Sequence, residues 1–158
     1  MKDSQLPLVT KQIGATHCGL ASLAHFIELT EDQIHDEIGK VDLPKGLTLE
    51  QLSKIMDDLR VKHKILKFTN VNELKNEFEI NWSSNKYIAN FYIPDVYPGE
   101  GDFGHFSPLV AFQNDRVCIG DTWPNFPNHT WTDLSTILSA MRSIDKESGE
   151  ERGLVRLF

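Results

Sequence analysis

The sequence predicts an α+β domain in which a helical first half packs on an antiparallel sheet formed by the second half. Apolar residues recur at helical spacing between residues 18 and 59, and this period is the main sequence signal of an amphipathic helix. From residue 87 onward, short segments rich in β-branched and aromatic residues alternate with turns, as strands do. A run of helices followed by a run of strands is typical of α+β domains and not of alternating β-α-β folds.

Three helices are expected before residue 60. Residues 18–29 carry apolar side chains at helical spacing, and Thr16 just before them is a candidate N-cap. Thr30 and Thr48 are each followed by Gln three residues later, which is the capping-box pattern. The second helix should end at Gly39, because glycine accepts the left-handed backbone of a helix C-terminus. A strand at 61–66 and a helix at 71–78 are expected to follow.

The second half is expected to form the sheet. A loop rich in Pro and Gly occupies residues 94–104, and Asn114-Asp115 is expected to turn a hairpin. The expected strands are 87–93, 106–113, 117–121 and 153–158, with a helix at 132–141.

Length and composition indicate one soluble domain, taken as residues 1–158. Apolar residues make up 40% and charged residues 25%, the usual globular balance. No apolar run is long enough to span a membrane, and the start at Met1-Lys2-Asp3-Ser4-Gln5 lacks the features of an export signal. We therefore expect a cytoplasmic protein, although the alternative that an export signal was removed from a longer precursor stays open.

The net charge of −7 argues against nucleic acid and anionic membranes as partners. The formation of a homodimer stays an open alternative.

The chain has two cysteines, Cys18 and Cys118. They form no CxxC pair and have no further ligands at zinc spacing, so a structural zinc site is not expected. Two cysteines in a domain of this size do not suggest a disulfide framework, although a single bridge stays open. The simpler interpretation is a reduced chain with one reactive thiol, Cys18, and one buried thiol, Cys118.

Cys18 is the candidate nucleophile. It lies in the first turn of an expected helix, where the positive end of the helix dipole stabilises a thiolate and lowers the thiol pKa. His105, at the start of a strand after the Pro/Gly-rich loop, is the candidate base. Asp121 ends the next strand, and His105 and Asp121 lie nearly equidistant from the hairpin turn. Asp121 could then orient one imidazole nitrogen and leave the other facing Cys18.

Further residues complete this candidate site. Gln12 lies six residues before Cys18, and its side-chain amide could form an oxyanion hole with the backbone N–H of Cys18. Gly19 would let a substrate approach closely, and Gly104 and Ser107 are also expected to contact it. Each residue alone has an ordinary explanation, since a lone cysteine on an apolar helix is usually buried. Their joint occurrence favours catalysis.

Several segments resemble the phytochelatin synthase family. QIGATHCGLASL at 12–23 resembles the nucleophile segment of that family. GHFSPL at 104–109, followed by a strand that ends in Asp121, resembles its His and Asp segments. AMRSIDKESGEERG at 140–153 resembles the stretch that closes its catalytic domain, and KGLT at 45–48 resembles an internal turn. The resemblance covers most of the chain in the same order.

The resemblance implies a papain-like cysteine proteinase fold and an enzyme that attacks the Cys-Gly bond of glutathione. Glycine leaves, and a γ-glutamylcysteinyl thioester forms on the nucleophile. A second glutathione, or its metal thiolate, then accepts the acyl group to give phytochelatin, a product of metal detoxification, whereas water gives γ-glutamylcysteine. The implied roles are nucleophile for Cys18, base for His105, orienter for Asp121 and oxyanion donor for Gln12. No cofactor or protein metal site is expected, because heavy-metal ions would act through the substrate thiolate.

The chain departs from the family pattern at two arginines, which Pro124 and Ile93 replace. The 158 residues contain no Cys-rich stretch like the C-terminal region of the plant enzymes, and short bacterial-type members without such a region are expected to act mostly as hydrolases. We therefore expect hydrolysis of glutathione, or of a similar γ-glutamyl thiol peptide, rather than phytochelatin synthesis. Two alternatives stay open: a papain-like peptidase with another substrate, such as a bacteriocin-leader-type peptidase, and a non-catalytic binding module on the same scaffold.

Overall fold

Six helices and six strands make up residues 5–158, the part of the chain that the computed structural model describes. The helices are α1 (Cys18–Ile27), α2 (Glu31–Ile38), α3 (Leu49–Asp58), α4 (Val71–Asn81), α5 (Ile93–Val96) and α6 (Leu134–Arg142). The strands are β1 (His63–Leu66), β2 (Lys86–Tyr92), β3 (Gly104–Gln113), β4 (Arg116–Gly120), β5 (His129–Asp133) and β6 (Gly153–Leu157). They form one antiparallel sheet in the order β1-β6-β2-β3-β4-β5.

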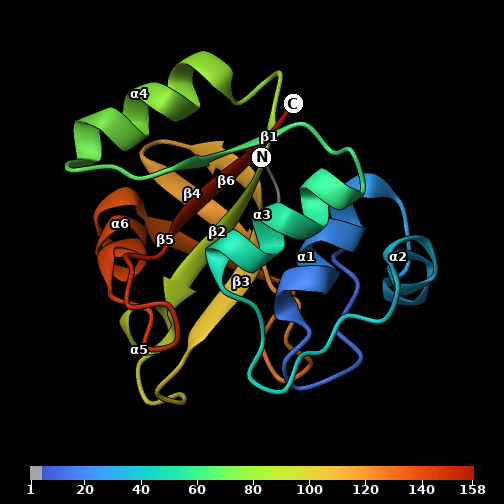
Figure 1. Ribbon diagram of the computed structural model, residues 1–158. Coiled ribbons are helices and arrows are strands. Elements are labelled where there is room, and N and C mark those ends of the chain that lie inside the picture. Colours follow the sequence, from blue (N-terminus) through green and yellow to red (C-terminus); the bar gives the residue numbers. More distant parts are fainter. Residues whose placement is uncertain (1–4) are drawn as a thin grey trace.

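The sheet separates two apolar cores. Figure 1 shows α1, α2 and α3 on one side of the sheet and α4, α5 and α6 on the other. On the first side, Leu20, Leu23 and Leu52 pack against the sheet with no exposed surface. On the second side, Phe78 of α4 and Ile137 of α6 are equally buried. This arrangement confirms the predicted α+β class, because the helices of the first half cover a sheet built mainly by the second half.

The two predicted capping boxes are present. The hydroxyl of Thr30 accepts a hydrogen bond from the backbone N–H of Gln33, and the Gln33 side chain accepts one from the N–H of Thr30. Thr48 and Gln51 make the same reciprocal pair at the start of α3. Gly39 ends α2 with a φ of 85°, a left-handed backbone that glycine adopts without strain. These boundaries are local, and the sequence therefore predicts them well.

The N-terminus of α1 differs from the prediction. His17, not Thr16, is the N-cap residue, and among the described residues no side chain makes a capping hydrogen bond there. The Thr16 hydroxyl instead donates to the carbonyl of Leu43, so Thr16 ties the segment before α1 to the loop before α3. Because no side chain caps this end, the first backbone N–H groups of α1 remain available to an anion.

The second half contains two elements that the sequence analysis missed. Residues 129–133 form β5, an edge strand that pairs with β4, so the helix predicted at 132–141 begins only at Leu134. The predicted loop at 94–104 begins within α5, where Pro94 occupies the first turn, a position that suits proline. The predicted hairpin turn is present, since Asn114 and Asp115 have φ values of 52° and 59°, as a two-residue hairpin turn requires.

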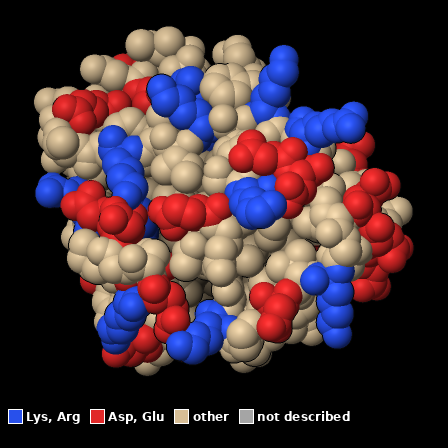
Figure 2. Space-filling view, viewed as in Figure 1, with Lys and Arg blue, Asp and Glu red and all other residues tan. Residues whose placement is uncertain are grey.

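Between residues 5 and 158, no helix is long and apolar enough to cross a membrane. The residues Met1-Lys2-Asp3-Ser4, which belong to the start for which no export signal was expected, lie outside the described residues. Figure 2 shows charges of both signs interspersed on the face seen in Figure 1, with acidic side chains gathered where α2 lies. Cys18 and Cys118 are both buried, and they are not joined in a disulfide.

The packing of α1 on the sheet predicts a large stability cost for Leu23→Ala. Leu23 has no exposed surface, and truncation of a buried leucine costs about 2–5 kcal/mol through lost burial and the cavity left behind. Urea unfolding followed by circular dichroism should show this loss as a lower midpoint. The matched variant Ile80→Ala, at a side chain that is 75% exposed, should change the unfolding free energy by less than about 0.5 kcal/mol. Equal midpoint shifts in the two variants would contradict this account.

Candidate active site

Cys18 is the first residue of α1, at its uncapped N-terminus. Burial of the thiol would by itself raise its pKa. A hydrogen bond from His105, the charge of that imidazole, and backbone N–H groups of Phe106 and Gly19 act in the opposite direction, and the pKa of Cys18 is lowered overall. The thiolate therefore persists at a pH where an ordinary thiol is protonated.

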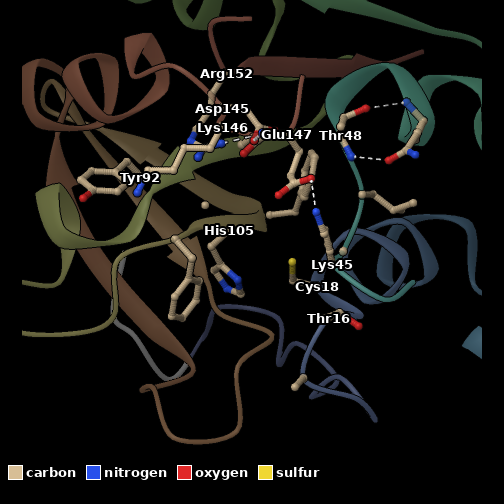
Figure 3. Close-up of a pocket in the computed structure, with 18 of the residues that line it drawn as sticks. Thr16, Cys18, Lys45, Thr48, Tyr92, His105, Asp145, Lys146, Glu147 and Arg152 are labelled. Atoms are coloured by element: carbon tan, nitrogen blue, oxygen red, sulfur yellow. Dashed lines mark hydrogen bonds and ion pairs between the residues drawn. The ribbon is translucent and has the colours of Figure 1, made fainter. Parts of the chain in front are cut away.

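His105 lies at the start of β3 with 1% of its surface exposed. Its ring meets Phe91, Trp123 and Phe126 edge to face, with ring centroids 5.7, 6.1 and 6.3 Å away. Among the described residues, no nitrogen or oxygen atom forms a hydrogen bond with Nδ1 of His105. Figure 3 shows the imidazole ring beside the sulfur of Cys18. Burial would lower the pKa of His105, but hydrogen bonds to Asp121 and Cys18 raise it to about 9.

Asp121 holds the other imidazole nitrogen. Its Oδ1 lies 3.0 Å from Nε2 of His105, and both side chains are fully buried. The backbone N–H of Trp123 donates to the same oxygen at 2.8 Å, and the hydroxyl of Tyr97 donates to Oδ2 at 2.7 Å. Three donors thus fix the orientation of a carboxylate that lies away from water.

The contact between His105 and Asp121 is diagonal rather than directly cross-strand. A β-bulge shifts the β3–β4 register next to Leu109, which pairs with Ile119. Continued in this register, Asp121 lies opposite Ser107, one diagonal step from His105. The proximity of the two side chains was predicted from the sequence. The bulge that shifts the register of the two strands was not.

Gln12 is buried beside the strand end that carries Asp121. Its backbone N–H donates to the carbonyl of Thr122 at 2.8 Å, and its side-chain Oε1 accepts from the Thr122 hydroxyl at 3.1 Å. Its Nε2 donates to the carbonyl of Gly14 at 2.7 Å, and the same carbonyl accepts from the backbone N–H of His17. A short chain of hydrogen bonds therefore runs from the end of β4 to the residue before Cys18.

A cavity of about 740 Å³ opens above Cys18 and His105. The segment before α1, the loop before α3, the end of the β2–β3 connection and the loop between α6 and β6 form its walls. Figure 3 shows Cys18 and His105 on one side of this space and Arg152, Asp145 and Lys146 on another. The thiol is thus accessible to a small molecule although little of its surface is exposed.

Arg152 is a site residue that the sequence analysis did not single out. It is 6% exposed and lines the cavity, and its Nη1 lies 3.5 Å from Oδ2 of Asp145. A Cβ on Gly104 would come within 2.5 Å of the guanidinium, so only glycine leaves room for Arg152 to lie there. The usable signal was the segment at 140–153, which contains both partners of this pair.

Two further ion pairs border the cavity. Lys45 Nζ lies 3.1 Å from Oε2 of Glu147, and Lys146 Nζ lies 3.1 Å from Oδ2 of Asp102. These side chains are between 50% and 73% exposed, so water screens their charges. The ion pair between Arg152 and Asp145 is much less exposed, and it is therefore the stronger electrostatic feature of the cavity.

Of the three residues expected to contact substrate, the structure brings Gly104 to the cavity but not Gly19 or Ser107. Ser107 is fully buried. An added Cβ on Gly19 would meet Leu47 at 3.0 Å and Phe106 at 3.4 Å, so this glycine permits close packing of α1. No group of three or more metal-ligating His, Cys, Asp or Glu side chains occurs between residues 5 and 158.

Comparison with solved structures shows the fold. The peptidase domain of Streptococcus ComA, a bifunctional ABC transporter, superposes with a TM-score of 0.62 at 17% identity, covering 93% of each chain. A double-glycine-motif protease from an AMS/PCAT transporter, solved with its leader peptide, gives 0.61 at 17% identity and covers 98% of this chain and 91% of its own. A C39-like peptidase from Bacillus anthracis gives 0.61 at 14% identity over 99% and 96%. The predicted papain-like cysteine peptidase fold is therefore confirmed.

Comparison of sequences shows the family. A glutathione gamma-glutamylcysteinyltransferase of Schizosaccharomyces pombe is 32% identical over an alignment of 118 residues that covers 71% of this chain. The chain spans only 28% of the length of that relative. The family model for phytochelatin synthase matches residues 5–154. This match covers nearly the whole chain, and the protein therefore belongs to the phytochelatin synthase family.

Proposed function

We propose that this protein cleaves the Cys-Gly bond of glutathione, or of a similar γ-glutamyl thiol peptide, through a thioester on Cys18. The observation that carries the proposal is a single cavity that joins a buried thiol–imidazole pair to the ion pair between buried Arg152 and partly buried Asp145. The first pair supplies the chemistry of acyl transfer, and the second supplies recognition of an amino-acid end group.

In the first step the Cys18 thiolate attacks the carbonyl carbon of the cysteinyl residue. The carbonyl electrons move to oxygen, where the amide of Gln12 and the backbone N–H of Cys18 can donate hydrogen bonds. The C–N bond then breaks, and protonated His105 gives its proton to the nitrogen of the leaving glycine. Asp121 stabilises the imidazolium and holds its orientation. The products of this step are glycine and a γ-glutamylcysteinyl thioester.

In the second step neutral His105 removes a proton from water, and the resulting hydroxide attacks the thioester. γ-Glutamylcysteine leaves, and the thiolate–imidazolium pair is restored. We favour water over a second peptide as acceptor, because Ile93 is fully buried in the core and Pro124 carries no charge. Those positions thus supply no additional cation to hold an acceptor peptide.

Arg152 and Asp145 support a γ-glutamyl substrate. The γ-glutamyl end of glutathione carries a free α-carboxylate and a free α-ammonium group on the same carbon. Arginine donates two parallel hydrogen bonds to a carboxylate, and aspartate accepts from an ammonium group. The pair of Arg152 with partly buried Asp145 in the cavity wall is therefore complementary to this zwitterion, which an internal peptide residue lacks.

Incubation with glutathione and mass spectrometry test the reaction. The wild type should release glycine and γ-glutamylcysteine, and rapid acid quenching should trap the enzyme with one γ-glutamylcysteinyl group on Cys18. Cys18→Ala should release no glycine, because the nucleophile is gone. The matched variant Cys118→Ala removes a thiol buried outside the cavity and should keep the activity. Glycine release by Cys18→Ala, or cleavage of α-linked tripeptides as readily as glutathione, would contradict the proposal.

Arg152→Met should raise KM for glutathione and lower kcat/KM by about ten- to a hundredfold, as expected for a lost hydrogen bond between charged groups. The penalty should vanish with 4-aminobutyryl-Cys-Gly, which lacks the α-carboxylate. Arg116→Met, at a half-exposed residue on β4, serves as the matched control. An equal loss of kcat/KM with both peptides would show that Arg152 maintains the fold and does not bind the α-carboxylate.

The pKa shifts predict the pH dependence. Alkylation of Cys18 by iodoacetamide should begin below the ordinary thiol pKa of about 8.5, because the imidazolium lowers the pKa of the thiol. In His105→Ala the inflection should move upward, since burial then acts without the compensating charge. Glycine release should decline above about pH 9, where His105 loses the proton that the leaving amine needs. A thiol inflection unchanged by His105→Ala would contradict the ion pair.

A further inference from the structure

We propose that Thr122 is a positioning residue that holds the side-chain amide of Gln12 in the orientation needed to donate to an oxyanion. The inference rests on the acyl-transfer chemistry proposed above and adds a residue to it. Thr122 directly follows Asp121, has no exposed surface, and donates its hydroxyl to Oε1 of Gln12 at 3.1 Å.

The physical reason is the ambiguity of a primary amide. The terminal torsion of glutamine is broad and roughly two-fold, so the oxygen and nitrogen of Gln12 could exchange places at little intrinsic cost. A flipped amide would direct its carbonyl oxygen toward the developing negative charge and would repel it. The Thr122 hydroxyl donates to the oxygen, and the Gly14 carbonyl accepts from the nitrogen at 2.7 Å. Together they select one of the two orientations.

The backbone adds a second constraint at the same place. The N–H of Gln12 donates to the carbonyl of Thr122 at 2.8 Å, so the segment that carries Gln12 is docked on the end of β4 by both main chain and side chain. The Gly14 bond uses one of the two hydrogens of the Gln12 amide, which leaves the other for a substrate oxyanion. One strand end therefore orients the base, through Asp121, and the oxyanion donor, through Thr122.

Two reagents that react with Cys18 by different routes test this role. In p-nitrophenyl acetate the thiolate attacks the acetyl carbon, the carbonyl electrons move to oxygen, and p-nitrophenolate departs with the bonding electrons, leaving an acetyl thioester. This route passes through an oxyanion. Iodoacetamide is attacked at its CH₂ carbon and loses iodide, so no oxyanion forms. Both rates are measured on the intact chain by stopped-flow absorbance and by mass spectrometry.

Thr122→Val keeps the shape of the side chain and removes the hydroxyl. We expect its acylation rate with p-nitrophenyl acetate to fall about tenfold, the effect of one lost hydrogen bond, while alkylation by iodoacetamide and its pH profile stay within about twofold. Thr122→Ser should recover most of the acylation rate. Thr132→Val, at a buried threonine of β5, is the matched control and should leave both rates unchanged.

A double-mutant cycle with Gln12→Ala separates positioning from general damage. In the Gln12→Ala background the further change Thr122→Val should cost no acylation rate, because the amide that Thr122 orients is absent. Unchanged acylation in Thr122→Val, a parallel fall in acylation and alkylation, or a full additional loss in the double variant would each overturn the inference. The test does not depend on glutathione: absent glycine release in the wild type contradicts the proposed substrate, whereas the acetyl ester still reports on Thr122.

Discussion

The buried pairing of the Cys18 thiol with the His105 imidazole is the interaction on which the site depends. Neither group would hold a charge easily in this apolar environment, since burial opposes ionisation of both. Each ionised group compensates the other, and the uncapped N-terminus of α1 and the carboxylate of Asp121 add to the balance. The fold accordingly brings the N-terminus of α1 and the start of β3, which are far apart in sequence, close enough for a hydrogen bond between Cys18 and His105.

The end of β4 organises the rest of the machinery. Asp121 receives donors from a backbone N–H, a tyrosine and the imidazole, and Thr122 receives the segment that contains Gln12. Lys11 donates to the carbonyls of Asp121 and Phe126 at 2.9 and 3.0 Å, which ties the same segment to the loop after β4. Preorganisation of this kind matters because donors that are already aimed need not reorient as charge develops.

The cavity has two distinct walls. Its charged wall lies across from the sulfur of Cys18, and the buried guanidinium of Arg152 in that wall depends on Gly104 for space. Gly104 also precedes His105 in β3. A single glycine thus permits the guanidinium of Arg152 to approach the strand that carries His105.

The local features of this protein follow from its sequence alone. Helix starts at Thr30 and Thr48 and the hairpin turn at Asn114 depend on contacts between residues a few positions apart, so composition and spacing are enough to predict them. The pairing of Cys18 with His105 was also predicted, because a cysteine at a helix start and a histidine after a glycine-rich loop stand out in the sequence, and the structure brings the two side chains together.

How these parts meet depends on long-range packing and is visible in the folded chain alone. Strand β5 forms because β4 offers an unpaired edge, and the bulge next to Leu109 sets the diagonal approach of His105 and Asp121. The pairing of Arg152 with Asp145 and the docking of Gln12 on Thr122 join residues whose side chains look ordinary in sequence. The physical reason is that burial and hydrogen-bond partners are properties of the packed chain, and they decide which charges and amides can act.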